Sequence, residues 1–342
     1  PSQQPEPPQF SAGWAIPQPD AVYYIDEKPY VVKADGVVDY QYFVVDPGYE
    51  RDVWLRAFEC RPGNYAVVHH IIAFVQEPDG KRTPMPAYVP GQDPAPPQEV
   101  NGSYLGEGGE RLRGGETSRG AQIGYAPGMP PSNYPEGWGL RVPAGSKFVF
   151  QMHYTVAGTP QPDRSCLGVV FADPRTIKHE VRGGVCGTVA FEIPAGAPDH
   201  VLTARRKFRR DTLLVGFMPH LHVRGTAFRY EAEYPDGRRE VLLDVPRYDF
   251  NWQLWYSPEK PILMPKGSRL ICTAHYDNSA DNVYNPDPTV AVRFGEQTWE
   301  EMMFGWFVWI DPSAQPFAAT PGDESDADDS PATPDEGDVT GE

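Results

Sequence analysis

The stretch Leu213–Gly225, LLVGFMPHLHVRG, combines an apolar, strand-like pattern with two histidines, His220 and His222, that are separated by one residue. Side chains at positions i and i+2 of an extended segment point to the same face, so both imidazoles can bind one ion without any bend in the backbone. The same spacing also occurs by chance in surface strands. This stretch therefore predicts a strand, and it leaves a metal site and an ordinary surface strand as alternatives.

The strand pattern recurs on both sides of this stretch. Residues 23–46 and 52–75 are rich in β-branched and aromatic side chains with turn residues between them, and residues 228–245 contain a Pro-Asp-Gly hairpin signal. Such runs are typical of antiparallel strands, and no long helical periodicity competes with them. The 39 Pro and 33 Gly among 342 residues also favour short strands joined by turns. We predict an all-β fold.

The chain is longer than a single core usually allows, so we predict two β-sandwich domains. The turn residues 173–176 mark the boundary, which gives an N-terminal domain of residues 21–175 and a C-terminal domain of residues 176–312. Residues 1–20 are rich in Pro and Gln and are predicted to form an extended or disordered arm. The Pro- and Gly-rich segment 77–122 is too long for a hairpin loop, and loops of that length are usually functional or mobile.

The formal charge of −17 is concentrated near the C-terminus. Residues 323–342 contain nine acidic side chains and no basic one, which leaves about −8 for the rest of the chain. We predict that the acidic tail, residues 313–342, is disordered. No basic cluster is large enough to follow a phosphate backbone, so nucleic acid is not expected as a partner. No apolar run approaches the roughly 20 residues that span a bilayer, so we expect no transmembrane segment.

Five of the eight histidines fall in three short contexts. His69-His70 lies in VVHHIIAF and His153 in FQMHYT, both before the domain boundary, and the His220/His222 pair follows it. An imidazole pair in so apolar a strand costs several kcal/mol unless each ring has a partner. Adjacent residues on a regular strand point to opposite faces, however. His69 and His70 can therefore share an ion only if the strand is kinked or one ring uses its other nitrogen.

A site with two histidines needs a further ligand, and the candidate is Met302 or Met303 in TWEEMMFGWFVW. Imidazole with thioether is a soft donor set that suits Cu(I), whereas zinc prefers thiolate, carboxylate or more imidazole. The alternative is that both methionines fill the core beside Trp306 and Phe307. These residues alone do not decide between the two.

The order His-His, His-Tyr, His-x-His and Glu-Met resembles the copper type II, ascorbate-dependent monooxygenases. This family contains peptidylglycine α-hydroxylating monooxygenase and dopamine β-monooxygenase, and the likeness is greatest to uncharacterised bacterial members. Residues 130–154, 219–253 and 296–306 are similar to the segments that carry the family's ligands, and the resemblance covers roughly residues 39–310. It implies two antiparallel, jelly-roll-like β-sandwich domains that face each other across a solvent-filled cleft.

The resemblance also implies a site and a reaction. The electron-transferring copper would be held by His69, His70 and His153, and the oxygen-binding copper by the implied catalytic residues His220, His222 and Met302. Met302 is preferred over Met303 because it follows the acidic residue directly, as in the family. The implied reaction uses O₂ and a one-electron donor such as ascorbate to hydroxylate a substrate C–H bond.

Three residues near the implied ligands depart from the peptide-amidating members. Met218 stands where those enzymes have an Arg that binds the substrate carboxylate, and Phe304 and Trp306 replace their Asn and Tyr. A peptide that ends in glycine is therefore not expected as the substrate. The pocket is instead expected to be apolar and aromatic.

Three polar residues are further candidates for roles near the site. Gln151 matches the family and is expected to orient a ligand or a water. Arg224 could contact a substrate anion, but a solvated or salt-bridged arginine is the simpler expectation. His275 has no ligand counterpart in the amidating enzymes, so a hydrogen-bonded structural histidine is expected rather than a role near the Met302 copper.

The four cysteines are widely spaced and contain no Cys-x-x-Cys pair. Two disulfides in an oxidising compartment and four buried thiols are both open from this spacing. Cys166 and Cys272 occupy positions that resemble disulfide-forming ones in the family, although the family's partner residues are missing. We predict the pairs Cys60–Cys166 and Cys186–Cys272, and with the resemblance they imply a periplasmic or secreted protein.

Three functions are therefore considered. The first is a copper monooxygenase whose partners are a small organic substrate, O₂ and an electron donor, and which we expect to be a monomer. The second is a non-catalytic copper-binding or electron-transfer protein that retains both sites. The third is a β-sandwich binding protein without a metal.

Overall fold

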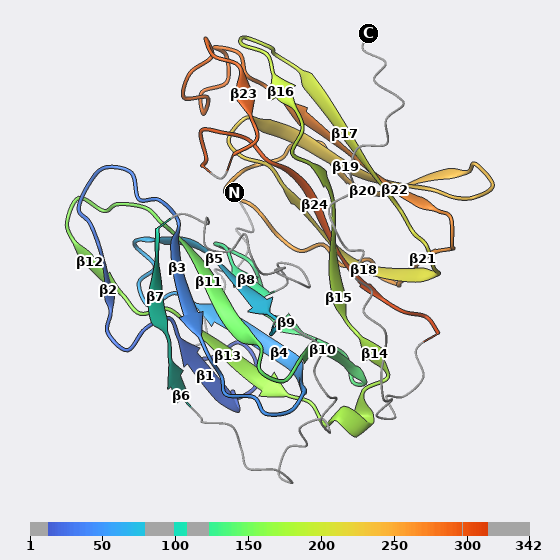
Figure 1. The fold of residues 1–342 in the computed structure, drawn as a ribbon. Coiled ribbons are helices and arrows are strands. Elements are labelled where there is room, and N and C mark those ends of the chain that lie inside the picture. Colours follow the sequence, from blue (N-terminus) through green and yellow to red (C-terminus); the bar gives the residue numbers. More distant parts are fainter. Residues whose placement is uncertain (1–12, 79–98, 108–122, 296, 314–342) are drawn as a thin grey trace, which may run out of the picture.

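The computed structural model describes residues 13–78, 99–107, 123–295 and 297–313. Over these residues the chain is all-β, as predicted, with one short 3-10 helix (Pro174–Thr176). Figure 1 shows the strands gathered into two lobes that follow one another along the chain. In the described part of the chain, no helix is long and apolar enough to cross a membrane. The predicted acidic tail beyond Ser313 and the first 12 residues of the predicted arm lie outside the described residues.

The N-terminal lobe has two main sheets and a small ribbon. The first sheet contains, in spatial order, β14 (His179–Glu180), β10 (Trp138–Val142), β4 (Val53–Arg61), β13 (Cys166–Phe171), β1 (Ala21–Tyr24) and β6 (Glu99–Asn101), and β9 (Ser132–Asn133) also pairs with β4. The second sheet contains β7 (Ser103–Glu107), β3 (Gln41–Val45), β11 (Lys147–Tyr154), β5 (Val68–Gln76) and β8 (Ile123–Tyr125). The ribbon pairs β2 (Tyr30–Val32) with β12 (Gln161–Asp163). These strand pairs are antiparallel except β1 with β6 and β10 with β14.

The C-terminal lobe repeats this two-sheet plan. One sheet contains β15 (Arg182–Thr188), β24 (Met303–Ile310), β18 (Thr212–His220) and β21 (Ile262–Met264). The other contains β17 (His200–Lys207), β22 (Arg269–Tyr276), β19 (Gly225–Glu233) and β20 (Arg239–Val245), and a ribbon pairs β16 (Glu192–Ile193) with β23 (Val292–Arg293). The predicted Pro-Asp-Gly hairpin joins β19 to β20, with Gly237 at a φ of 85° that suits glycine.

Each lobe has its own apolar core. In the N-terminal lobe, Leu55 and Phe58 of β4 lie in one buried cluster with Phe43 of β3 and Phe150 of β11, so the side chains of the two sheets meet in the middle. A second buried cluster fills the C-terminal lobe. Each fully buried Phe or Leu contributes about 1.5–3 kcal/mol. The alternating apolar positions noted in the sequence are therefore the inward faces of two sandwiches.

The two lobes share a local sequence that we did not anticipate. Pro143-Ala144-Gly145-Ser146 precedes β11, Pro265-Lys266-Gly267-Ser268 precedes β22, and seven residues after each Ser come His153 and His275. The glycines have φ values of 69° and 96°, and in both turns the Ser amide donates to the Pro carbonyl oxygen. The strands that follow have the same order of buried and exposed residues. The two lobes thus share an internal repeat of this turn and strand.

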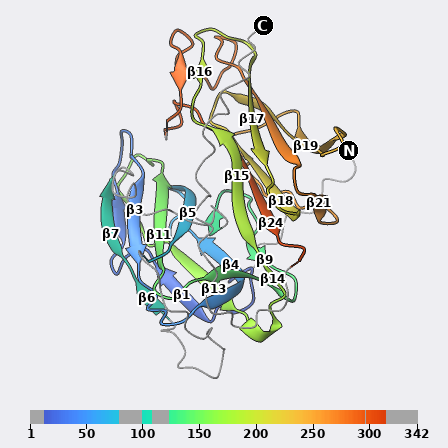
Figure 2. The same cartoon turned by 45° about the vertical axis from the view of Figure 1, so that its right-hand side comes forward.

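The boundaries of the lobes differ slightly from the predicted ones. Part of the predicted arm is packed, because Ile16 is buried against Ala57 and Val170, and Glu59 accepts the amide hydrogen of Ala15 (2.7 Å). Strand β14 pairs with β10, so the first lobe continues past the predicted hinge to Glu180. The long segment 77–122 contains β6 and β7 among its described residues. Figures 1 and 2 both show the chain passing between the lobes from β14 to β15.

The predicted disulfides are absent, because all four cysteines are free, buried thiols. In the pairing of β4 with β13, Cys60 lies opposite Leu167 and Cys166 lies opposite Arg61. This offset of one residue sends the two thiols to opposite faces of the sheet. The Cys60–Cys166 prediction was therefore wrong.

Cys186 and Cys272 do come together, in the core of the second lobe, but as thiols. The Cys186 Sγ donates to the carbonyl oxygen of Leu270 (3.5 Å). Burial raises the pKa of the Cys272 thiol well above its usual range, and the neighbouring Cys186 adds to this. The Cys272 thiol is therefore held in the unreactive, protonated form, and the cysteines give no support to an oxidising compartment.

Candidate metal centre

A β-bulge in β5 brings His69 and His70 to the same side of their strand. Opposite β11, Val68 pairs with Tyr154 and His70 pairs with His153, so His69 is an extra residue with no position opposite it. A bulge of this kind turns a side chain away from its regular direction. The bulge supplies the kink that two adjacent histidines need if they are to share one ion.

The three imidazoles of the first lobe converge. The Nδ1 atom of His70 lies 3.3 Å from Nδ1 of His69 and 3.3 Å from Nδ1 of His153. All three residues offer a nitrogen within 4.8 Å of the others, the only such group of histidine, cysteine or acidic side chains in the described part of the chain. Nitrogens about 2.0 Å from a tetrahedral ion lie about 3.3 Å apart. The spacing therefore fits a first-row transition metal.

Burial keeps these imidazoles neutral. It lowers the pKa of His69, and together with the charge of His153 it lowers the pKa of His70 well below the usual range. Burial, with a smaller contribution from His69, lowers the pKa of His153 to about 3. Neutral imidazole is the form that binds metals. Because these three rings bind protons weakly, protons compete little with a metal ion for their nitrogens.

In the second pair of histidines, Nδ1 of each ring is used for a hydrogen bond within the protein. His220 ends β18, and its Nδ1 lies 2.6 Å from Oε1 of Gln253, while Nδ1 of His222 lies 3.2 Å from the carbonyl oxygen of Glu300. Both partners are acceptors, so each Nδ1 carries the hydrogen and each Nε2 is left as the unprotonated ligand atom. Burial lowers the pKa of both rings, and that of His222 falls to about 3.

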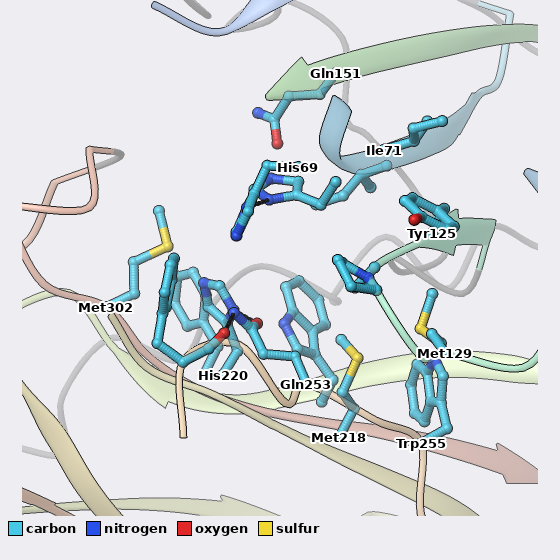
Figure 3. A pocket seen from close by; sticks show the side chains of 18 of the residues that line it. His69, Ile71, Tyr125, Met129, Gln151, Met218, His220, Gln253, Trp255 and Met302 are labelled. Carbon is cyan, nitrogen blue, oxygen red and sulfur yellow. Dashed lines mark hydrogen bonds between the residues drawn. The ribbon is translucent and has the colours of Figure 1, made fainter. Parts of the chain in front are cut away.

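The two candidate methionines point to different surroundings. Met303 begins β24 and is fully buried in the core of the second lobe. Met302 precedes it and, by the alternation of an extended chain, points the other way. It lines the same pocket as His69 and His220, and Figure 3 shows its thioether extending into that pocket. Only Met302 of the two is placed to join His220 as a ligand.

Glu301 connects the segments that carry these residues. Its fully buried carboxyl group accepts the amide hydrogens of His222 (2.9 Å), Arg224 (2.8 Å) and Met302 (3.3 Å). Burial raises the pKa of Glu301 to about 8, and these amides and Arg224 oppose that rise. The prediction from sequence used this residue only as a marker for Met302. A carboxylate directly before a candidate ligand was the available signal for its role.

Arg224 and His275 lie outside the pocket. The Arg224 guanidinium is buried, and it donates to Oδ1 of Asn278 (2.8 Å) and to the carbonyl oxygen of Trp299 (2.9 Å). It is thus a structural arginine, although neither solvated nor at the surface. His275 forms a surface pair with Asp199 (2.8 Å), as expected of a hydrogen-bonded structural histidine.

The repeat explains the position of His275. In the second lobe Tyr276 pairs with Gly225 and His275 with Ala227, which leaves Thr226 as the bulged residue. Thr226, Ala227 and His275 therefore stand where the first lobe has its three histidines. The second lobe keeps the bulge and one imidazole, and its other candidate ligands lie just before the bulge.

His69 and His70 of the first set and His220 of the second line one pocket between the lobes. The ring of Phe250 stacks on His69 (centroids 5.3 Å apart) and meets His222 edge-on (6.1 Å). His220 and His222 are close enough to contribute to the lowered pKa of His70, after burial and the nearer His153 and His69. Gln151 also lines the pocket: it points toward His69 in Figure 3 and donates to the Tyr42 hydroxyl (2.6 Å).

The rest of the pocket wall is apolar and aromatic. The first lobe contributes Ile71, Ile72, Phe74, Tyr125 and Met129, and the second contributes Met218, Trp255, Phe304 and Trp306. Large apolar walls with a few polar groups are typical of a small-molecule site. The three residues singled out by their departure from the amidating enzymes, Met218, Phe304 and Trp306, all line it.

No family model matches the sequence, and no curated protein is significantly similar to it. The resemblance to the copper type II monooxygenases therefore rests on the residues and the geometry described above.

Proposed function

We propose that this protein is a two-copper monooxygenase. The observation that carries the proposal is one apolar pocket lined by members of two complementary ligand sets. One set has three imidazoles, His69, His70 and His153, and the other combines two imidazoles with a thioether, His220, His222 and Met302. Imidazole suits several metals, but a thioether beside imidazole favours copper and its reduced form.

The reaction would be the hydroxylation of a C–H bond. In balanced form, R–H, O₂, two electrons and two protons give R–OH and water, and the electrons come from a one-electron donor such as ascorbate. Copper bound at the two sets would supply the one-electron redox chemistry and the reactivity toward O₂. The apolar wall would keep bulk water away from the reacting carbon.

The residues around the second set orient its ligands. Gln253 and the carbonyl group of Glu300 hold the Nδ1 hydrogens of His220 and His222, which fixes the tautomer and the ring orientation. Gln253 is itself fixed, because its amide nitrogen donates to the carbonyl oxygen of Phe250 (2.8 Å). These contacts prepare two Nε2 atoms for a metal before it binds.

The test is metal content together with the ligand set. Copper-loaded protein should contain two copper ions per chain, and His153→Ala should lose one of them. X-ray absorption of the reduced protein should show a sulfur scatterer that disappears in Met302→Ile. Met264→Ile, which replaces a fully buried core methionine of the same lobe, is the matched control and should keep the sulfur.

Activity is the second part of the test. With ascorbate and a panel of organic molecules, O₂ uptake coupled to a hydroxylated product is expected, and Met302→Ile should abolish it. Two reducible copper ions with no product from any molecule would indicate an electron-transfer protein. Failure to bind copper at all would overturn the proposal and favour a binding protein without a metal.

A further inference from the structure

The walls of the pocket point to the chemical class of the substrate. We infer that the substrate is a small, uncharged molecule with a flat, largely hydrocarbon body such as an aromatic ring. This inference deepens the proposed function and rests on it for the reaction. Binding of the molecule can be tested without the metal.

Charge is the first argument. Among the described residues that line the pocket there is no Asp, Glu, Lys or Arg. Arg224, the cation closest to His222 in sequence, uses its guanidinium for Asn278 and Trp299. An ammonium or carboxylate group on the substrate would lose its hydration here without gaining a partner, which costs several kcal/mol.

Bound copper would not reverse this selection. Its positive charge would lie at the histidine end of the pocket, where it would repel an ammonium group. A carboxylate would be drawn to the metal itself rather than held against the apolar wall. Neither ion would be positioned with a C–H bond toward the ligands.

The strand register sets the dimensions of the binding surface. On the paired strands β18 and β24, His220 lies opposite Phe304 and Met218 lies opposite Trp306. Positions i and i+2 of a strand are about 7 Å apart, which is close to the length of a substituted benzene ring. A ring that lies over Met218 and Trp306 would therefore extend its substituent to His220 and, beyond Phe304, to Met302.

Aromatic side chains around this surface favour a flat guest. Phe304 and Trp306 lie with ring centroids 5.6 Å apart at 66°, and Trp255 and Tyr125 complete the wall. Aromatic rings bind flat apolar molecules through offset and edge contacts, and Met218 adapts its shape to them. Figure 3 shows Met218, Trp255 and Tyr125 around one open space that also receives His220 and Met302.

The experiment compares three probes of equal size on metal-free protein: 2-phenylethanol, phenylacetate and 2-phenylethylammonium. Their binding is followed by tryptophan fluorescence, because Trp255 and Trp306 line the pocket. The neutral probe should bind at least about tenfold more tightly than either ion, since an unpaired buried charge costs more than the 1.4 kcal/mol that this factor requires. Equal binding of the three probes, or tighter binding of an ion, would overturn the inference.

Met218→Arg supplies the missing charge. It should strengthen phenylacetate binding by about tenfold or more, because a hydrogen bond to a charged group contributes about 1.5–3 kcal/mol. Val241→Arg, on an exposed position of β20, is the matched control and should leave the order of the probes unchanged. Unchanged phenylacetate binding in a folded Met218→Arg protein would count against the inference.

A second variant keeps the test decisive if Met218→Arg does not fold. Trp306→Leu shortens the wall and should weaken 2-phenylethanol binding about tenfold, as expected when an aromatic contact of about 1.4 kcal/mol is lost. Undiminished binding would place the probe elsewhere and overturn the inference. Because these assays use metal-free protein, a failure to bind copper would overturn the proposed function and leave the result on the pocket intact.

Discussion

Glu301 provides the sharpest test of how the second ligand set is held together. Glutamine in its place keeps one acceptor oxygen and replaces the other by an NH₂ group. The glutamine amide can be placed in two orientations, and the better one keeps its oxygen where two amides donate. That oxygen then still accepts the amide hydrogens of His222 and Met302, while the NH₂ group faces the amide of Arg224, which loses its acceptor. A buried donor left without an acceptor costs about 1–3 kcal/mol. We expect Glu301→Gln to destabilise the segment that carries the histidines by about 2 kcal/mol.

Amide hydrogen exchange measures this loss directly. A local cost of about 2 kcal/mol corresponds to exchange that is faster by on the order of 30-fold, and it should be confined to residues 219–226 and the start of β24. In copper-loaded protein the sulfur signal of Met302 should weaken, and the affinity of the second set for Cu(I) should fall by about 10–100-fold, the usual effect of losing an outer contact. The three-histidine set should be unaffected.

Glu59→Gln is the matched control. Glu59 also uses its carboxylate to accept two backbone amides, those of Ala15 (2.7 Å) and Ile16 (3.3 Å), but it does so in the other lobe and away from the pocket. Both amides share one oxygen, Oε2, which glutamine can keep, so Glu59→Gln should leave exchange in residues 13–20 near the wild-type rate and the sulfur signal unchanged. If Glu301→Gln leaves exchange in residues 219–226 at the wild-type rate, the carboxylate does not hold this segment and the reasoning fails.

Three further predictions concern pH, the internal repeat and the thiols. Burial lowers the pKa of His153 to about 3, so below about pH 6.5 the unfolded chain binds a proton that the folded chain does not, and stability falls as the pH falls. In urea titrations, the free energy of unfolding of the metal-free protein should fall by about 2 kcal/mol per such histidine between pH 7 and pH 5. If His153→Gln does not reduce this dependence on pH, the prediction is wrong. Thr226→His with Ala227→His should complete a three-imidazole set around His275 and raise the copper content from two to three ions per chain, whereas Thr226→His alone should not. All four thiols should react with a thiol reagent in urea without prior reduction and resist it in the native protein, because each is buried; fewer than four thiols in urea would show that a disulfide forms in solution.

The local features of the fold were well predicted because they depend on neighbours in the chain. Alternating apolar residues in segments such as 68–76 identify strands, and Pro-Asp-Gly identifies the hairpin between β19 and β20. The internal repeat was also present in the sequence, in the matching Pro-x-Gly-Ser turns before β11 and β22, and a comparison of the two halves would have revealed it.

The cysteines show where reasoning from sequence fails. Cys60 and Cys166 lie on paired strands of the same lobe, which is compatible with a bridge. Whether two thiols meet depends on the register of the strands, and a shift of one residue sends them to opposite faces. Register is set by the packing of both sheets together, which no short stretch encodes.

Local patterns in the chain were enough to predict the strand class, the approximate division into two lobes, and the set of imidazoles and thioethers from which a metal site could be built. Which of these side chains meet depends on how distant strands pair and pack. The pairing of β5 with β11 joins residues 83 positions apart and creates the bulge that unites His69, His70 and His153. The direction of one side chain at the start of β24 separates Met302 from Met303, and Glu301 fastens that segment to His222. The physical reason is that side-chain identity is local, whereas convergence depends on hydrogen-bonded contacts between strands that are distant in the chain.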